Sequence, residues 1–170
     1  MKVLGAVLLI AACTLFGVGR ASDLRDRQRC TEDALSALRY LDAELTSAGT
    51  PMPEIFSALA ERADLRVRGV FRILAERASM LGEESLGDIW TDCWLRDAGV
   101  SLQEPERRAL ARLGPVLGRY PGPEQSGAVR ACIAHFEEAA KQGAVRAKEG
   151  AKLSTSVGLT LGLMLAAALV

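Results

Sequence analysis

The sequence has few of the residues on which enzyme chemistry most often depends. Its 170 residues include one histidine, His135, and four cysteines that stand singly, without a CxxC pair. The cysteines are Cys13, Cys30, Cys93 and Cys132. A single histidine excludes most serine or cysteine triads, and isolated cysteines indicate neither a zinc site nor a disulfide framework. Lone cysteines favour a reducing compartment. His135 lies beside Phe136 on a charged helix flank, and we expect it at or near the surface.

An excess of charge and the common phosphate-binding motifs are also missing. The 21 basic and 21 acidic residues interleave and sum to a formal net charge of zero, so no basic stripe is available for a nucleic acid backbone. There is no GxxxxGK loop, no strand followed by GxGxxG, and no HExxH. The acidic pairs Glu83-Glu84 and Glu137-Glu138 point to different sides of a helix, which favours a solvated face over paired catalytic carboxylates. We predict no enzyme activity, no cofactor or metal, no small-molecule substrate and no nucleic acid partner.

Long uncharged runs are present at both ends of the chain. Residues 153–170 contain no charge, and their length approaches the roughly 17 to 25 residues of a membrane helix. Residues 3–19 form a second such run, preceded by Lys2. Two other interpretations of the first run stay open. It is also compatible with a cleaved signal peptide, although no clear A-x-A site is present, and with a lipoprotein signal at Cys13, although the following residues remain apolar.

Basic residues lie on the inner side of both runs and predict the topology. They are Arg20, Arg25, Arg27 and Arg29 after the first run, and Lys141, Arg146, Lys148 and Lys152 before the second. By the positive-inside rule, these flanks belong in the cytoplasm. We therefore predict membrane helices at 1–20 and 153–170, with one cytoplasmic domain at 21–152 between them. A rival prediction is a secreted chain that receives a glycolipid anchor near Gly143 and Ala144.

Small residues recur at every fourth position towards the C-terminus. They are Gly150, Ser154, Gly158, Gly162 and Ala166. Such a ridge includes a GxxxG pattern and lets another helix approach closely, so it predicts a surface for a partner helix. The alternative is that Gly and Ala are simply common in membrane helices.

The region between the runs has helical periodicity throughout. Leucines spaced by three and four predict an amphipathic helix over 22–49, and the prolines in residues 50–54 interrupt it. A second helix is expected from about Pro53 to Gly82, and a third is capped by Ser85. The third helix carries Trp90 and Trp94 one turn apart. They are compatible with a ligand shelf, but core packing is the preferred interpretation because large aromatics bury most area in a small core.

Two further helices complete the all-α prediction. Ser101 and Glu104 predict a capping box before a helix that carries Leu110, Leu113 and Leu117. Residues 119–123 contain two prolines and a glycine and predict a break. After it, residues 124–152 have one apolar stripe and lead towards the terminal run without a strong stop signal. No segment alternates apolar and polar residues long enough to predict a strand.

The order of these landmarks resembles the stage III sporulation protein AB family of endospore-forming bacteria, a relative of the inner-membrane platform protein of type II secretion. The most diagnostic pieces are residues 50–54 (TPMPE) and Leu117-Gly118 with Gln125 eight residues after Leu117. The resemblance also covers Ser85-Leu86 with Trp90 and the basic helix that leads into a glycine-rich tail. One departure is Pro121, where the family pattern usually has Asp, so a contact made by that Asp is in question here.

The resemblance implies a non-enzymatic part of the assembly that connects mother cell and forespore. It implies a cytoplasmic helical bundle similar to the type II secretion F domain, held at the outer forespore membrane on the mother-cell side. Other stage III sporulation membrane proteins and a secretion-type ATPase are the expected partners. Candidate contacts are Glu44, Pro51, Pro53 and Glu54, for which maintenance of the fold is the alternative role. The other functional classes are a secreted or lipid-anchored helical binding module and a membrane enzyme, which would need a catalytic group that we do not find.

Overall fold

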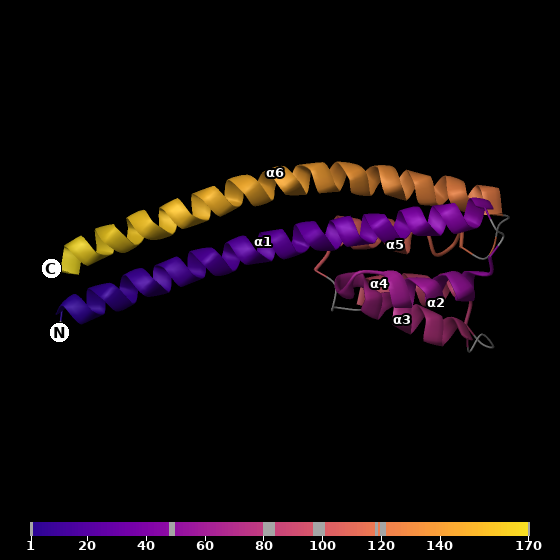
Figure 1. The fold of residues 1–170 in the computed structure, drawn as a ribbon, viewed down its shortest axis with the longest axis horizontal. Helices are drawn as coiled ribbons and strands as arrows, with labels where there is room; N and C mark the ends of the chain where they lie inside the picture. The colour runs from indigo at the N-terminus through magenta and orange to yellow at the C-terminus, as the bar shows by residue number, and fades with distance from the viewer. Residues whose placement is uncertain are drawn as a thin grey trace. The chain divides into compact units, whose positions relative to one another are not determined.

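The computed structural model describes residues 2–47, 50–79, 84–96, 101–117, 119 and 122–169. Within the terminal helices, side chains are described for 22–46 and 124–150, and for Gly19 and Thr160. Six α-helices and no strands occur in this part of the chain (Figure 1). The helices are α1 (Lys2–Ser47), α2 (Met52–Arg62), α3 (Leu65–Ser79), α4 (Leu86–Arg96), α5 (Glu104–Ala111) and α6 (Gly122–Leu169). The predicted all-α class is therefore confirmed for the described residues.

The chain divides into two compact units. One, here called the terminal unit, comprises Met1–Gln28 and Lys141–Val170, and the other, the core unit, comprises Arg29–Ala140. Helices α1 and α6 contribute to both units. The domain boundaries predicted at 20/21 and 152/153 are not tested by this division and remain predictions.

Helices α1 and α6 run without a break through the two predicted membrane segments. Within the described part of the chain, no helix is both long enough and apolar enough to cross a membrane. Most side chains of 1–20 and 153–170 lie outside the described residues. The two membrane spans therefore remain predictions.

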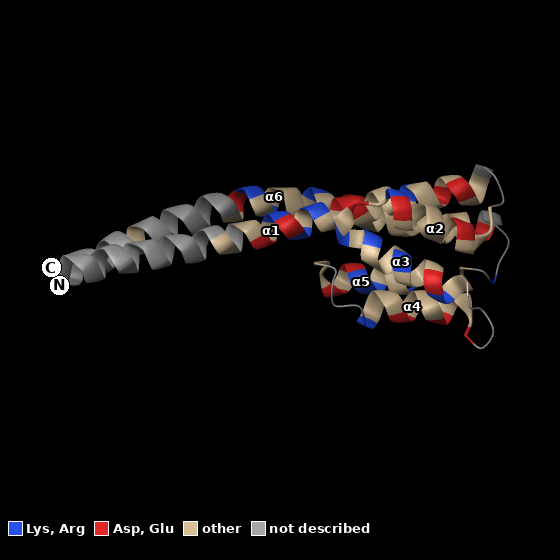
Figure 2. Cartoon of the chain, turned by 60° about the horizontal axis from the view of Figure 1, so that its bottom comes forward, with Lys and Arg blue, Asp and Glu red and all other residues tan. Residues whose placement is uncertain are grey.

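In the terminal unit, α6 packs against α1 through small residues. A Cβ atom added to Gly150 would lie 2.6 Å from Cδ1 of Leu24, and one added to Gly143 would meet the side-chain amide of Gln28. Gly143 meets Gln28, and the later residue Gly150 meets the earlier residue Leu24, so the two helices are antiparallel here. Figures 1 and 2 both draw them side by side. Gly150 of the predicted ridge thus faces α1 of its own chain. The other ridge positions, Ser154, Gly158, Gly162 and Ala166, lie outside the described side chains.

The core unit is organised around four aromatic side chains. Trp90 and Trp94 of α4 are 0% and 2% exposed. The ring of Trp90 stacks on Phe56 of α2 with centroids 5.7 Å apart, and Trp94 meets Phe71 of α3 edge-on at 5.9 Å. The indole Nε1 of Trp90 donates a hydrogen bond of 2.6 Å to the carbonyl oxygen of Leu110. The preferred prediction for the two tryptophans, core packing, is confirmed.

Polar contacts join α1 and α6 inside the core unit. Arg130 of α6 pairs with the Asp42 carboxylate of α1 at 3.0 Å, and the Ser126 hydroxyl donates to the same carboxylate at 2.5 Å. One helical turn away along α1, Arg39 pairs with Glu137 at 2.7 Å. The Arg39–Glu137 pair is exposed and contributes little to stability, whereas the partly buried Asp42 carboxylate satisfies two donors. These contacts fix how α6 lies along α1 and so position the helix that forms one wall of the groove described below.

Two of the predicted helices differ from the structure. The helix predicted from about Pro53 to Gly82 is interrupted at Ala63–Asp64, which separates α2 from α3. The amides of Val67 and Arg68 donate to the Asp64 carbonyl, so a new helix starts there. The helix predicted to carry Leu110 to Leu117 ends at Ala111, and turns follow to Leu117. Leu113 and Leu117 remain buried because the turns lie against the core.

The helix starts can be compared with the predicted caps. The amide of Asp88 donates to the Ser85 hydroxyl at 3.2 Å, which confirms the Ser85 cap of α4. The capping box predicted from Ser101 and Glu104 is wrong, because α5 begins two residues later than that box requires. Instead, the backbone amide of Gln103 donates to the Glu106 carboxylate at 2.7 Å. The same carboxylate lies within 3.4 Å of the Thr31 hydroxyl on α1, a tertiary contact that the local pattern does not contain.

Candidate functional site

Glu44, the first of the predicted contact residues, is held within the fold. The Thr50 hydroxyl, just before α2, donates to the Glu44 carboxylate at 3.0 Å. The Tyr40 hydroxyl, one helical turn earlier, is also hydrogen bonded to this carboxylate. Burial, and then Glu44, raise the pKa of Tyr40 above its ordinary value. Glu44 therefore ties the end of α1 to the segment that starts α2.

Pro51 and Pro53 set the start of α2. Pro51 has φ −59° and ψ 139°, and its carbonyl accepts hydrogen bonds from the amides of Glu54 at 3.0 Å and Ile55 at 3.2 Å. Pro53 lies in the first turn, where its missing N–H costs no helical hydrogen bond. Its carbonyl accepts from the Ser57 hydroxyl at 2.9 Å. Both prolines thus have a clear structural role, although Pro51 is also exposed.

Glu54 is the acidic side chain at this corner that faces solvent. It lies in the first turn of α2, where the helix dipole favours a carboxylate. Its carboxylate forms no hydrogen bond or ion pair with the described part of the chain. The structure therefore connects Glu44, Thr50 and Pro51 into one corner, at which the Glu54 side chain is exposed.

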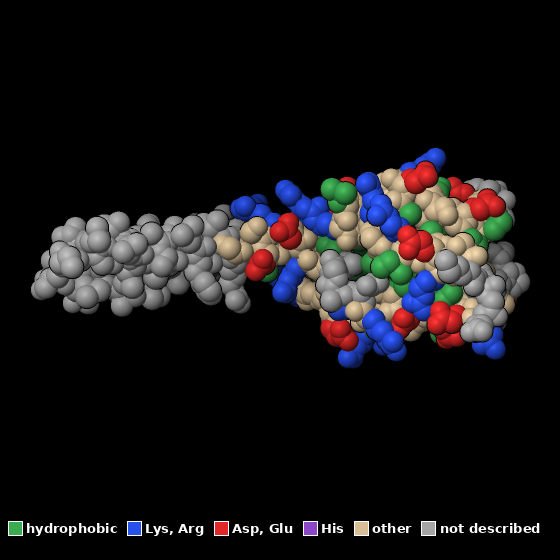
Figure 3. All heavy atoms as spheres, turned by 90° about the horizontal axis from the view of Figure 1, so that it is seen from below, with side chains coloured by type: hydrophobic (Ala, Val, Ile, Leu, Met, Phe, Trp, Pro, Cys, Tyr) green, Lys and Arg blue, Asp and Glu red, His purple; other side chains and the backbone are tan. Residues whose placement is uncertain are grey.

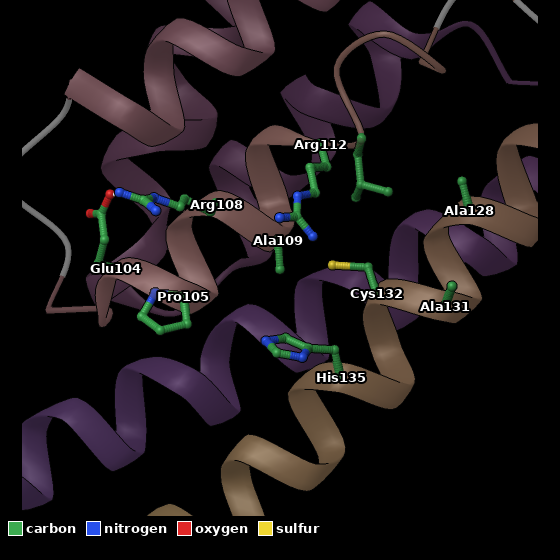
Figure 4. A pocket seen from close by; sticks show the side chains of 10 residues that line it. Glu104, Pro105, Arg108, Ala109, Arg112, Ala128, Ala131, Cys132 and His135 are labelled. Carbon is green, nitrogen blue, oxygen red and sulfur yellow. The ribbon is translucent and has the colours of Figure 1, made fainter.

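A groove between α5 and α6 was not predicted from the sequence. It has a volume of about 660 Å³ and lies wholly within the core unit (Figure 4). Its walls include Pro105, Arg108 and Arg112 on the α5 side, and Ala131, Cys132 and His135 of α6. Arg112, Cys132 and His135 point towards a common space in Figure 4. The spacing of the two arginines and of the α6 residues is visible in the sequence, but their meeting depends on tertiary packing.

The two arginines of this groove differ in whether they form an ion pair with a described residue. Arg108 is paired with Glu104 at 2.8 Å, one helical turn earlier. Arg112 is exposed, and its guanidinium has no hydrogen bond or ion pair with the residues described. His135 is also exposed, and its ring lies edge-on to Phe136 at 6.1 Å. The groove can therefore offer an unpaired cation and an imidazole beside an apolar wall.

Covalent chemistry is not favoured at the Cys132 thiol on this wall. Cys132 is buried, and burial raises its pKa to about 12. A thiol is a nucleophile only as the thiolate, which is scarce at neutral pH for such a group. Burial likewise raises the pKa of Cys30 to about 11, and Cys30, Cys93 and Cys132 are free thiols. Within the described residues, no group of His, Cys, Asp and Glu is arranged to hold a metal ion.

On the described residues, basic and acidic side chains are mixed over the surface. In Figure 2, basic and acidic residues follow one another along the described helices. The face of the molecule in Figure 3 has both signs interspersed with apolar side chains. This distribution suits specific protein contacts made by a few residues better than binding to a uniformly charged polymer.

Comparisons with known proteins give one consistent result. The family model described as Stage III sporulation protein AB matches residues 2–170. A Stage III sporulation protein AB of Bacillus subtilis (strain 168) is 24% identical over 172 residues, which cover 97% of this chain and 96% of that protein. A solved structure of a Stage III sporulation protein AB (SpoIIIAB) has a TM-score of 0.64 at 21% identity and covers 71% of this chain and 94% of that chain. The structural likeness supports the same fold.

Proposed function

The chain belongs to the stage III sporulation protein AB family, and from this premise we propose that it is a non-enzymatic, membrane-anchored component of the stage III sporulation assembly. Its helical core, similar to the type II secretion F domain, docks a secretion-type ATPase on the mother-cell side of the outer forespore membrane. Its terminal helices hold the core at that membrane and meet other stage III sporulation membrane proteins. The observation that carries this proposal is the family match over 2–170, which includes both apolar ends and the whole core.

The predicted topology distinguishes this proposal from a secreted or lipid-anchored module. With the core in the cytoplasm, the end of α6 lies on the far face of the membrane. We therefore expect a reporter enzyme that works only outside the cytoplasm to be active when it is fused after Val170. A reporter that works only in the cytoplasm should be inactive at the same position. Gly127 is an exposed position of the core, and fusions after it should give the reverse result. The reporter that works only in the cytoplasm should be active there, and the other should be inactive. Extracytoplasmic activity of both fusions would support the secreted or lipid-anchored module and contradict the proposed topology.

The corner at the start of α2 is the first candidate contact with the ATPase. Glu54→Arg reverses an exposed charge in the first turn of α2, so we expect weaker co-purification of the ATPase and a loss of about 1 kcal/mol in unfolding free energy, because the helix dipole disfavours a cation there. Glu44→Gln should weaken its hydrogen bonds to Thr50 and Tyr40 and lower the unfolding free energy by about 1 kcal/mol. Both variants should be measured by co-purification and by urea unfolding of the full chain.

Glu76→Arg is the matched control, because Glu76 is an exposed carboxylate on the neighbouring helix α3. It should leave the recovery of the ATPase unchanged. If the Glu44 and Glu54 variants fold and retain the ATPase as the wild type does, the corner is not the docking face.

A further inference from the structure

The groove between α5 and α6 contains a cation, Arg112, that no described residue pairs with. Arg108 and Arg112 are one turn apart, and within the part of the chain that the structure describes only Arg108 has an acidic partner, Glu104. The nitrogens of the Arg112 guanidinium present up to five donors and match a carboxylate in a bidentate arrangement. Figure 4 shows Arg112 directed towards the same space as Cys132 and His135. An acidic side chain in that space would pair with Arg112 without displacing a contact between described residues.

The α6 wall of the groove is built from small side chains. Ala128 is half-buried and Ala131 is exposed, and together with Cys132 they present little more than methyl groups and one sulfur. Small residues allow the backbone or apolar side chains of a second helix to approach closely, and an apolar groove suits one face of an amphipathic helix. The volume of about 660 Å³ accommodates several side chains. The site therefore combines an apolar wall with a cation, Arg112, that has no partner among the described residues.

We propose that this groove receives an acidic amphipathic helix of the secretion-type ATPase. The proposal rests on the proposed function for the identity of the partner, whereas the groove supplies the chemistry of the contact. A glutamate or aspartate of the partner pairs with Arg112, and apolar side chains on the same face of its helix lie on Ala128 and Ala131. His135 borders this contact. The groove is a second docking surface, distinct from the corner at Glu44 and Glu54.

Two substitutions test the charge and the shape of the groove separately. Arg112→Glu replaces the attractive charge with a repulsive one, so the full chain should bind the ATPase at least about tenfold more weakly. Ala131→Trp keeps the charge and fills the groove, so it should weaken binding to a similar extent. Affinities should be measured with the detergent-solubilised full chain and the purified ATPase. Both substituted positions are exposed, so thermal unfolding should show that the variants remain folded.

Each variant has a matched control on the same core unit. Arg96 is an exposed arginine of α4 with a side chain 85% accessible, and Arg96→Glu should bind the ATPase like the wild type. Ala134 is an exposed alanine of α6 that does not border the groove, and Ala134→Trp should also bind normally. These controls separate a local effect from a general effect of charge or bulk.

The single histidine gives a direct signal from the groove. His135 is the chain's one histidine, so its imidazole produces one set of nuclear magnetic resonance signals. On addition of the ATPase, this set should shift or broaden in the wild type and in the Arg96→Glu variant. It should shift or broaden less in Arg112→Glu at the same concentrations, because less of that variant is bound.

The outcomes separate the two proposals. If the wild type does not bind the ATPase, the proposed function and this inference are both overturned. If the wild type binds and both groove variants bind equally well, the inference is overturned while the proposed function stands. If the groove variants lose self-association but keep the ATPase, the occupant is a second copy of this chain and the inference is wrong.

Discussion

Replacement of Trp90 by alanine is expected to lower the unfolding free energy of the core unit by about 3–5 kcal/mol. The indole is fully buried, and its ring lies against Phe56, Phe71 and Trp94. Alanine would leave a large cavity between α2, α3 and α4. It would also leave the Leu110 carbonyl without the hydrogen bond that Nε1 donates at 2.6 Å. Because domains are stable by only about 5–15 kcal/mol, such a loss brings the core close to unfolding.

The measurement is urea unfolding of the full chain, followed by circular dichroism at 222 nm in a detergent that keeps the wild type folded. Trp90→Phe is the graded control. It retains an aromatic ring but loses the hydrogen bond, so its loss should lie well below that of alanine. Leu95→Ala, at a side chain 44% exposed on the same helix, should change stability by less than about 1 kcal/mol. A Trp90→Ala variant as stable as Leu95→Ala would show that α4 is not the centre of the core.

Most of the helices can be predicted from the sequence, because interactions between residues close together in the chain determine where they begin and end. Prolines 51 and 53 cannot continue α1, so the break before α2 follows from two residues. Ser85 has the side chain that an N-cap requires and is found in that position. Trp90 and Trp94 share a face because the helix repeats every 3.6 residues. In each case, the decisive interaction joins residues close together in the sequence.

The two helices that differ from the prediction combine local contacts with tertiary packing. The break at Ala63–Asp64 contains neither proline nor glycine, and there the Arg68 side chain donates from Nε to the Ala63 carbonyl at 2.9 Å. Helix propensity alone would continue through this segment, but the core aromatics are buried only when α3 turns back on α2. The start of α5 likewise uses Glu106, which also approaches Thr31 of α1. The contact between Glu106 and Thr31 joins residues 75 positions apart, so sequence spacing cannot supply it.

The candidate site likewise combines residues that can be predicted from the sequence with contacts that depend on tertiary packing. The sequence predicts the same role for Glu44 and Glu54, but in the folded chain Glu44 accepts a hydrogen bond from Thr50 and Glu54 is exposed. The groove beside Arg112 was missed because its walls come from α5 and from α6, which meet only in the tertiary structure. A pattern of one exposed arginine and several alanines is too common to identify a groove. Its significance comes from the absence of an acidic partner for Arg112 among the described residues.

Replacement of Gly114 by alanine is expected to destabilise the core unit by about 1–3 kcal/mol through overpacking. Gly114 follows α5 and lies against Gly87 in the first turn of α4. A Cβ atom at Gly114 would lie 2.5 Å from the Gly87 carbonyl oxygen and would also collide with the Thr91 hydroxyl. A backbone carbonyl cannot rotate away as a flexible side chain can, so α4 and the turn after α5 must separate. The separation would strain the hydrogen bond from the Thr91 hydroxyl to the Ala111 carbonyl, at 3.3 Å.

Gly69→Ala provides the control of opposite sign. Gly69 is exposed in the middle of α3, and a Cβ atom there would meet nothing within 4 Å. Alanine should therefore stabilise the helix by roughly 0.5–1 kcal/mol, because glycine loses more backbone entropy on folding. Urea unfolding of both variants should move the midpoint in opposite directions. If Gly114→Ala is as stable as Gly69→Ala, the backbones of Gly87 and Gly114 do not approach each other as closely as the structure shows. The hydrogen bond from Trp90 to the Leu110 carbonyl would then need another explanation than this close contact.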